Sequence, residues 1–144
     1  MTDLQALHDS THTMVMGVLN ITEDSSSDGG LWLDPAKAAQ HGRDMMAAGA
    51  DIIDIGAEST RPGAKRVAEA DELARITGAV KTLIPAGAIL SIDTTRASVA
   101  LAALEHGAQI INDVSGGQLD RELPHVVADH SDCLYIVQHW RGWL

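Results

Sequence analysis

The chain has 144 residues, and its 20 acidic side chains against 10 basic ones give a formal net charge of −10. This balance argues against nonspecific binding to nucleic acid or to anionic membranes, because both need basic patches. A single cysteine excludes an internal disulfide and a Cys-rich zinc site, and no apolar run approaches the roughly 18 residues of a membrane span, so we expect a cytoplasmic location.

The beginning of the chain predicts a leader followed by the first strand and helix. Residues 1–12 are polar and without periodicity, so we expect a flexible leader before a single domain over 13–144. Residues 14–20 are apolar and predict a buried strand. Asp34 and Pro35 then indicate an N-cap and a first helical residue, and Gly49 indicates the end of that helix.

The same alternation of strand and helix continues through the rest of the chain. Apolar runs predict strands at 51–56, 88–93, 108–113 and 134–139. Between the second and third strands, an apolar stripe at helical spacing predicts a helix; the stripe is Leu73, Ile76, Val80 and Leu83. The helix after the third strand is expected to stop before Gly107. Asp120 is expected to cap the helix after the fourth strand. Strands that are apolar throughout are typical of parallel sheets, so the pattern predicts an α/β fold.

The first four predicted strands run directly into polar and glycine residues. The segments are NITEDSSSDGG (20–30), GAESTRPGA (56–64), SIDT (91–94) and IND (111–113). A (β/α)8 barrel carries its chemistry at this position, at the carboxyl ends of parallel strands. We therefore expect a functional site at one edge of the sheet.

Together these segments resemble the first half of the dihydropteroate synthase family of folate biosynthesis. The resemblance spans residues 14 to about 141 and implies a pterin-binding TIM barrel, truncated here to about four βα units plus a fifth strand. It also implies a transferase that condenses (7,8-dihydropterin-6-yl)methyl diphosphate with 4-aminobenzoate, giving 7,8-dihydropteroate and diphosphate. Full-length members of the family are expected to be homodimers.

The first two loops offer groups that suit a diphosphate. Asn20 and Asp28 are hard oxygen ligands of the kind that Mg²⁺ accepts beside phosphate oxygens, so Mg²⁺ is the expected cofactor. Arg61 can hold a phosphate in bidentate fashion, or can instead pair with a neighbouring acid such as Glu58. The resemblance implies that Thr60 and Arg61 bind substrate and that Pro62 lies beside the entering aryl amine.

Two later strand ends imply the pterin contacts. By resemblance, the Asp93 carboxylate would pair with two adjacent N–H donors of the heterocycle, and the Asn112 amide with a neighbouring edge. An aspartate that ends an apolar strand is costly to bury without a partner. The alternative interpretation is structural: Asp93 or Thr94 would cap the following helix, and Asp113 would support a loop.

Other interpretations stay open at this point. Ser26 stands where the family usually has phenylalanine, which leaves binding of 4-aminobenzoate undecided. A pterin-dependent methyltransferase domain is disfavoured because such domains lack the loop that contains Arg61 and Pro62. A noncatalytic remnant or a pterin-binding module is favoured by the short chain, and activity of the isolated chain is doubtful. Fragment, frameshift product and natural half-barrel are not distinguished.

Overall fold

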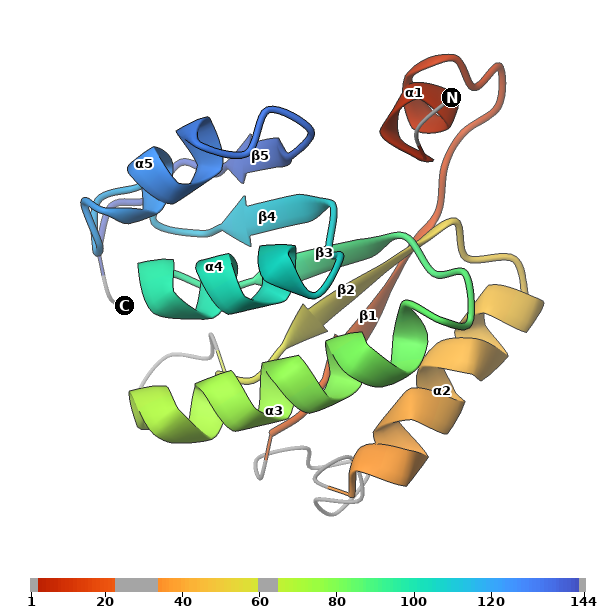
Figure 1. Cartoon of the computed structure of the whole chain (residues 1–144), viewed down its shortest axis with the longest axis horizontal. Helices are drawn as coiled ribbons and strands as arrows, with labels where there is room; N and C mark the ends of the chain where they lie inside the picture. Colours follow the sequence, from red (N-terminus) through yellow and green to blue (C-terminus); the bar gives the residue numbers. More distant parts are fainter. Residues whose placement is uncertain (1–2, 23–33, 60–64, 143–144) are drawn as a thin grey trace.

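The computed structural model describes residues 3–22, 34–59 and 65–142, which form a parallel sheet with helices along it (Figure 1). The strands are β1 (Met16–Asn20), β2 (Ile52–Gly56), β3 (Leu90–Asp93), β4 (Ile110–Asp113) and β5 (Leu134–Val137). The helices are α1 (Asp3–His8), α2 (Pro35–Ala47), α3 (Glu69–Leu83), α4 (Ala97–Glu105) and α5 (Leu123–Ala128). Each strand lies inside the segment that the sequence predicted.

The strand order in the sheet follows the order in the chain. The sheet is β1-β2-β3-β4-β5, and all neighbouring pairs are parallel. Figure 1 shows α2, α3, α4 and α5 side by side along one face of this sheet. The predicted α/β fold with parallel strands is therefore confirmed, and a sequential parallel order is the arrangement of strands in a (β/α)8 barrel.

The two faces of the sheet differ in composition. Fully buried isoleucines make up the face that packs against the helices: Ile53, Ile55, Ile92 and Ile111. The residues that alternate with these isoleucines along the strands form the opposite face, which has Asp54, Ser91 and Asn112 at its centre. On this face the outer strands β1 and β5 expose apolar side chains: Val18 is 54% exposed and Leu134 is 48% exposed. The helix-covered face therefore contains the core, and polar groups lie on the other face.

Local signals in the sequence predicted both ends of α2. The carboxylate of Asp34 accepts a hydrogen bond from the amide of Ala36 at 3.0 Å, and Gly49 has a φ of 114°, as expected for a residue just beyond a helix. Residues 1–12, expected as a leader, contain α1. Among the described helices, none is long and apolar enough to cross a bilayer.

The expected role of Asp120 was wrong. The N-cap of α5 is Glu122, and the Asp120 carboxylate instead accepts a hydrogen bond from the amide of Ala97, at the first turn of α4, at 2.8 Å. Asp120 also accepts a hydrogen bond from the amide of Glu122 at 3.0 Å. The side chain therefore joins the loop after β4 to the start of α4, a contact that the local sequence did not indicate.

Candidate functional site at the carboxyl edge of the sheet

Three of the predicted site residues lie in one row across the sheet. Asn20 ends β1 and is in register with Gly56, Gly56 is in register with Asp93, and Asp93 is in register with Asn112. All four positions are at the carboxyl end of their strands. We expected Asn20, Thr60, Arg61, Asp93 and Asn112 to converge at one edge of the sheet, and this is confirmed for Asn20, Asp93 and Asn112, while Thr60 and Arg61 lie outside the described residues.

Gly56 lies between Asn20 and Asp93 in this row, and both of their side chains are close to it. A Cβ atom at Gly56 would lie 3.3 Å from Oδ2 of Asp93 and 3.6 Å from Oδ1 of Asn20. The first of these distances is shorter than ordinary van der Waals contact, so a side chain here would displace the carboxylate. The glycine keeps open the space beside the oxygens of Asn20 and Asp93.

Asp93 is held in an unfavourable environment for a negative charge. Burial raises its pKa to about 7, and the nearby charges of Asp54, Glu72, Glu58 and Asp113 act in the same direction. No described residue donates a hydrogen bond to its carboxylate. A half-buried acid whose pKa is acted on by negative charges alone is a candidate for binding a ligand that brings its own N–H donors.

Asn112 is held from both sides by groups that the sequence did not single out. Its Nδ2 donates to Oδ1 of Asp54 at 3.3 Å, and its Oδ1 accepts from Nε2 of Gln138 at 2.7 Å. The Ser91 hydroxyl also donates to Oδ1 of Asp54, at 2.6 Å, while burial raises the pKa of Asp54. The signal for Asp54 was present, since an acid inside the apolar strand IIDIG needs a partner.

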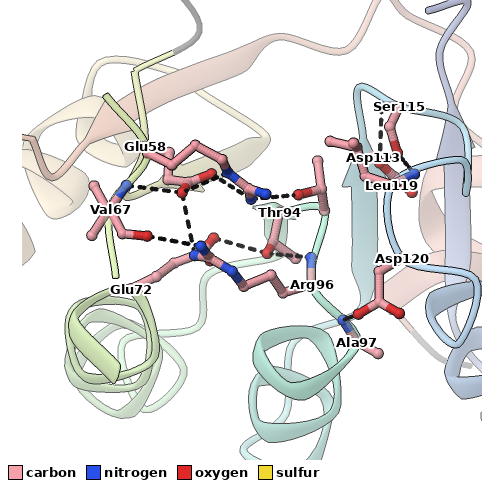
Figure 2. A network of polar contacts seen from close by, with 12 residues as sticks. Glu58, Val67, Glu72, Thr94, Arg96, Ala97, Asp113, Ser115, Leu119 and Asp120 are labelled. Carbon is pink, nitrogen blue, oxygen red and sulfur yellow. Dashed lines mark hydrogen bonds and ion pairs between the residues drawn. The ribbon is translucent and has the colours of Figure 1, made fainter. Parts of the chain in front are cut away.

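A second group of charges, which includes Glu58, Glu72 and Arg96, lies beside α3 and α4 (Figure 2). Nη1 of Arg96 lies 2.7 Å from Glu72 and 3.2 Å from Glu58, and Nη2 of Arg96 donates to the carbonyl of Val67 at 2.8 Å. The Thr94 hydroxyl donates to Glu72 at 2.8 Å. This cluster connects the segments after β2 and β3 to the first turn of α3.

Glu58 has a further partner in this cluster. Nη2 of Arg66 lies 3.1 Å from Oε2 of Glu58 and also donates to the hydroxyl of Thr95 at 2.9 Å. Glu58 therefore pairs with Arg66 and Arg96 among the described residues. Arg61, the partner considered from the sequence, lies outside the described residues.

The structural interpretation is confirmed for Asp113 but not for Thr94, because the N-cap of α4 is Arg96, which makes no side-chain capping hydrogen bond. The hydroxyl of Thr94 accepts a hydrogen bond from the amide of Arg96 at 3.2 Å, just before α4. Asp113 is fully buried and accepts hydrogen bonds from the loop after β4 and from the hydroxyl of Tyr135, at distances between 2.7 and 2.9 Å. Thr94 and Asp113 therefore act as local supports beside the row.

The remaining predicted site residues lie outside the described residues: Asp28, Thr60, Arg61 and Pro62. Within residues 3–22, 34–59 and 65–142, no group of three or more His, Cys, Asp and Glu side chains is arranged to hold a metal ion. This does not argue against Mg²⁺, which takes one or two protein ligands and completes its shell with phosphate and water. Asn20 has an exposed side chain with an oxygen available for such a role.

Comparisons with known proteins agree with this geometry. The model of the family described as "Pterin binding enzyme" matches residues 16–143. The dihydropteroate synthase of Mycobacterium leprae is 54% identical over 127 residues, which are 88% of this chain and 44% of that protein. The enzyme of Bacillus subtilis is 45% identical over 127 residues, covering 88% of this chain and 45% of that protein.

Solved structures of dihydropteroate synthases are also similar to this chain. A dihydropteroate synthase from Clostridium difficile, crystallised in the presence of pteroic acid, matches with a TM-score of 0.82 and 40% identity over 92% of this chain and 51% of that one. The Xanthomonas albilineans enzyme with 4-aminobenzoic acid matches with a TM-score of 0.83 and 38% identity, over 92% and 48%. The chain spans about half the length of these relatives, and its sheet corresponds to part of their TIM barrel.

Proposed function

This chain belongs to the pterin binding enzyme family, and we propose that it carries the pterin- and diphosphate-binding part of a dihydropteroate synthase. The proposed reaction joins (7,8-dihydropterin-6-yl)methyl diphosphate to 4-aminobenzoate and releases 7,8-dihydropteroate and diphosphate. The observation that carries the proposal is the row of Asn20, Asp93 and Asn112 at the carboxyl edge of the sheet, with an Asp93 that no described residue donates to.

The pterin is assigned to Asp93 and Asn112. The heterocycle has a guanidine-like edge with two adjacent N–H donors, and a carboxylate can accept both in parallel. Such a ligand would supply the donors that Asp93 lacks and would offset the repulsion from its acidic neighbours. The Asn112 amide, the next group along the row, can donate to one ring atom and accept from another.

The diphosphate is assigned to the first two loops. Asn20 and Asp28 offer the neutral and the carboxylate oxygen that fit Mg²⁺, which when bound would neutralise charge on the leaving diphosphate. Arg61 and Thr60 are assigned to the same leaving group, because a guanidinium matches two phosphate oxygens at once. Pro62 is assigned to the side of the entering aryl amine.

The chemical step needs no protein nucleophile. The bond between the pterin methylene carbon and the diphosphate oxygen breaks, and its electron pair leaves with diphosphate. The amine nitrogen of 4-aminobenzoate then bonds to that carbon and releases a proton. Because the pterin can delocalise the positive charge at the methylene carbon, Asp93 and Asn112 contribute orientation and Arg61 contributes charge stabilisation.

The test is binding of a soluble pterin to the purified chain, measured by fluorescence quenching. Asp93→Asn should weaken binding by about 10- to 100-fold, since hydrogen bonds to a charged group exceed neutral ones. Asp132→Asn, which removes the same charge at an exposed position, should leave affinity unchanged. A chain that binds no pterin, or equal affinity in both variants, would contradict the proposed function.

Turnover, location and assembly belong to the same proposal. Formation of 7,8-dihydropteroate from both substrates, with loss of activity on chelation of Mg²⁺, would support the full reaction. Water-soluble substrates fit a cytoplasmic location. A homodimer is proposed, as expected for full-length members of the family, and light scattering would give the mass of the assembly.

A further inference from the structure

The side-chain amide of Asn112 is part of a chain of hydrogen bonds that crosses three strands and the end of a fourth. The Ser91 hydroxyl on β3 donates to Oδ1 of Asp54 on β2, at 2.6 Å. Nδ2 of Asn112 on β4 donates to the same oxygen at 3.3 Å. Nε2 of Gln138, directly after β5, donates to Oδ1 of Asn112 at 2.7 Å.

The donor and acceptor roles in this series of hydrogen bonds are determined by Asp54. An ionised carboxylate only accepts hydrogen bonds, so Asp54 requires Nδ2 of Asn112, rather than Oδ1, to face it. With Nδ2 turned toward Asp54, Oδ1 of Asn112 faces Gln138 and requires a donor there. Gln138 meets that requirement with its own amide nitrogen. A flip of either amide would place acceptor against acceptor or donor against donor.

We propose that Asp54 and Gln138 are positioning residues that hold the Asn112 amide in one orientation for reading the pterin ring. This inference rests on the proposed function, which assigns the ring to Asn112. With one N–H and one lone pair occupied, Asn112 keeps one N–H and one lone pair for the ligand. The Asn112 amide therefore binds a ring edge that places an acceptor opposite its N–H and a donor opposite its oxygen. It disfavours an edge on which the acceptor and the donor are exchanged.

Gln138 is the better of the two residues for a test, because it is exposed and contributes no core packing. Gln138→Met keeps the length of the side chain and removes the N–H donor. Gln138→Glu keeps the shape and, when ionised, presents an acceptor to Oδ1 of Asn112. If Gln138 only filled space, both variants would behave like the unaltered chain. Gln40→Met, on the exposed side of α2, is the matched control.

The first measurement is NMR of the Asn112 side-chain NH₂ group in the chain without ligand. We expect Gln138→Met to shift its two proton resonances and to speed their exchange with each other, and we expect Gln40→Met to change neither. Unchanged Asn112 resonances in Gln138→Met would overturn the inference. This measurement needs no pterin, so it decides the positioning role even if the proposed function fails.

The second measurement is pterin affinity in the same variants. We expect Gln138→Met to weaken binding by roughly fivefold to tenfold, the range for loss of one aligned hydrogen bond, with Gln138→Glu weaker still. Thermal unfolding should be the same in all variants, which separates positioning from folding. Affinity that is unchanged in both Gln138 variants, while Asn112→Ala weakens it, would overturn the inference.

Discussion

Glu72 and Asp93 are two acids that lie near each other, and the fold surrounds them in opposite ways. Glu72 is fully buried, yet it has Arg96 at 2.7 Å and the Thr94 hydroxyl at 2.8 Å. Asp93 is less buried, but the charges that act on its pKa are all negative. Burial raises the pKa of both, and for Glu72 the contacts with Arg96 and Thr94 oppose that effect.

The difference in charged partners distinguishes an acid that stabilises the fold, Glu72, from an acid that is suited to binding a ligand, Asp93. The charge of Glu72 is matched inside the protein, so removing its partner affects folding. The charge of Asp93 is unmatched among the described residues, so it costs stability until a ligand supplies donors. Deep burial alone would have selected Glu72, whereas the absence of a cationic partner within residues 3–22, 34–59 and 65–142 identifies Asp93.

The largest expected effect comes from removing the partner of Glu72. Arg96→Met leaves a buried carboxylate without its cation and should destabilise the fold by about 3–5 kcal/mol, measured by urea unfolding. Replacing Glu72 with Met as well should recover much of that loss, because the unpaired charge is gone. Arg121→Met, at an exposed position, is the control. A loss below about 1 kcal/mol, the range of surface pairs, would mean that Glu72 is not a structural acid.

The opposite result is expected when Asp93 is neutralised. Its pKa of about 7 in the folded state lies above the ordinary 3.8, so its charge lowers stability fully above pH 7. As the pH falls from 7 toward 3.8, that penalty disappears. Asp93→Asn should therefore be more stable than the unaltered chain at pH 8, by about 1–2 kcal/mol after allowing for solvent screening, and equal near pH 4. Urea unfolding at the two pH values tests this; a variant less stable at pH 8 would refute it.

The smallest expected effect is a shift in the pH at which pterin affinity is half-maximal. Because pterin binding is assigned to the ionised Asp93, affinity should rise with pH, with a midpoint near the pKa of about 7. Asp54 is the nearby charge with the largest effect on that pKa, so Asp54→Asn should move the midpoint to lower pH. The readout is the pH at half-maximal affinity, measured for each chain. An unmoved midpoint would show that Asp54 does not act on Asp93 through its charge.

The sequence by itself determined the five strands and the edge where the site lies. Apolar strands and helical stripes are local patterns, so each strand was found within its predicted segment. Asn20, Asp93 and Asn112 were placed together because parallel strands bring their carboxyl ends to one edge. Asp34 and Gly49 were identified at helix ends for an equally local reason, since capping involves only neighbouring residues.

Only the tertiary structure decided which partner each polar group has. Asn112 and Asp54 are 58 residues apart, Asn112 and Gln138 are 26 apart, and Arg96 reaches Glu58 across 38. The Asp120 carboxylate accepts a hydrogen bond from the first residue of α4, Ala97, although α5 is closer in sequence and Glu122 is the N-cap of α5. Such pairs have no local signature, because the meeting of a donor and a carboxylate depends on how separate βα units pack. For the same reason the sequence marked Asp93 as a site residue but could not show that its surroundings are acidic.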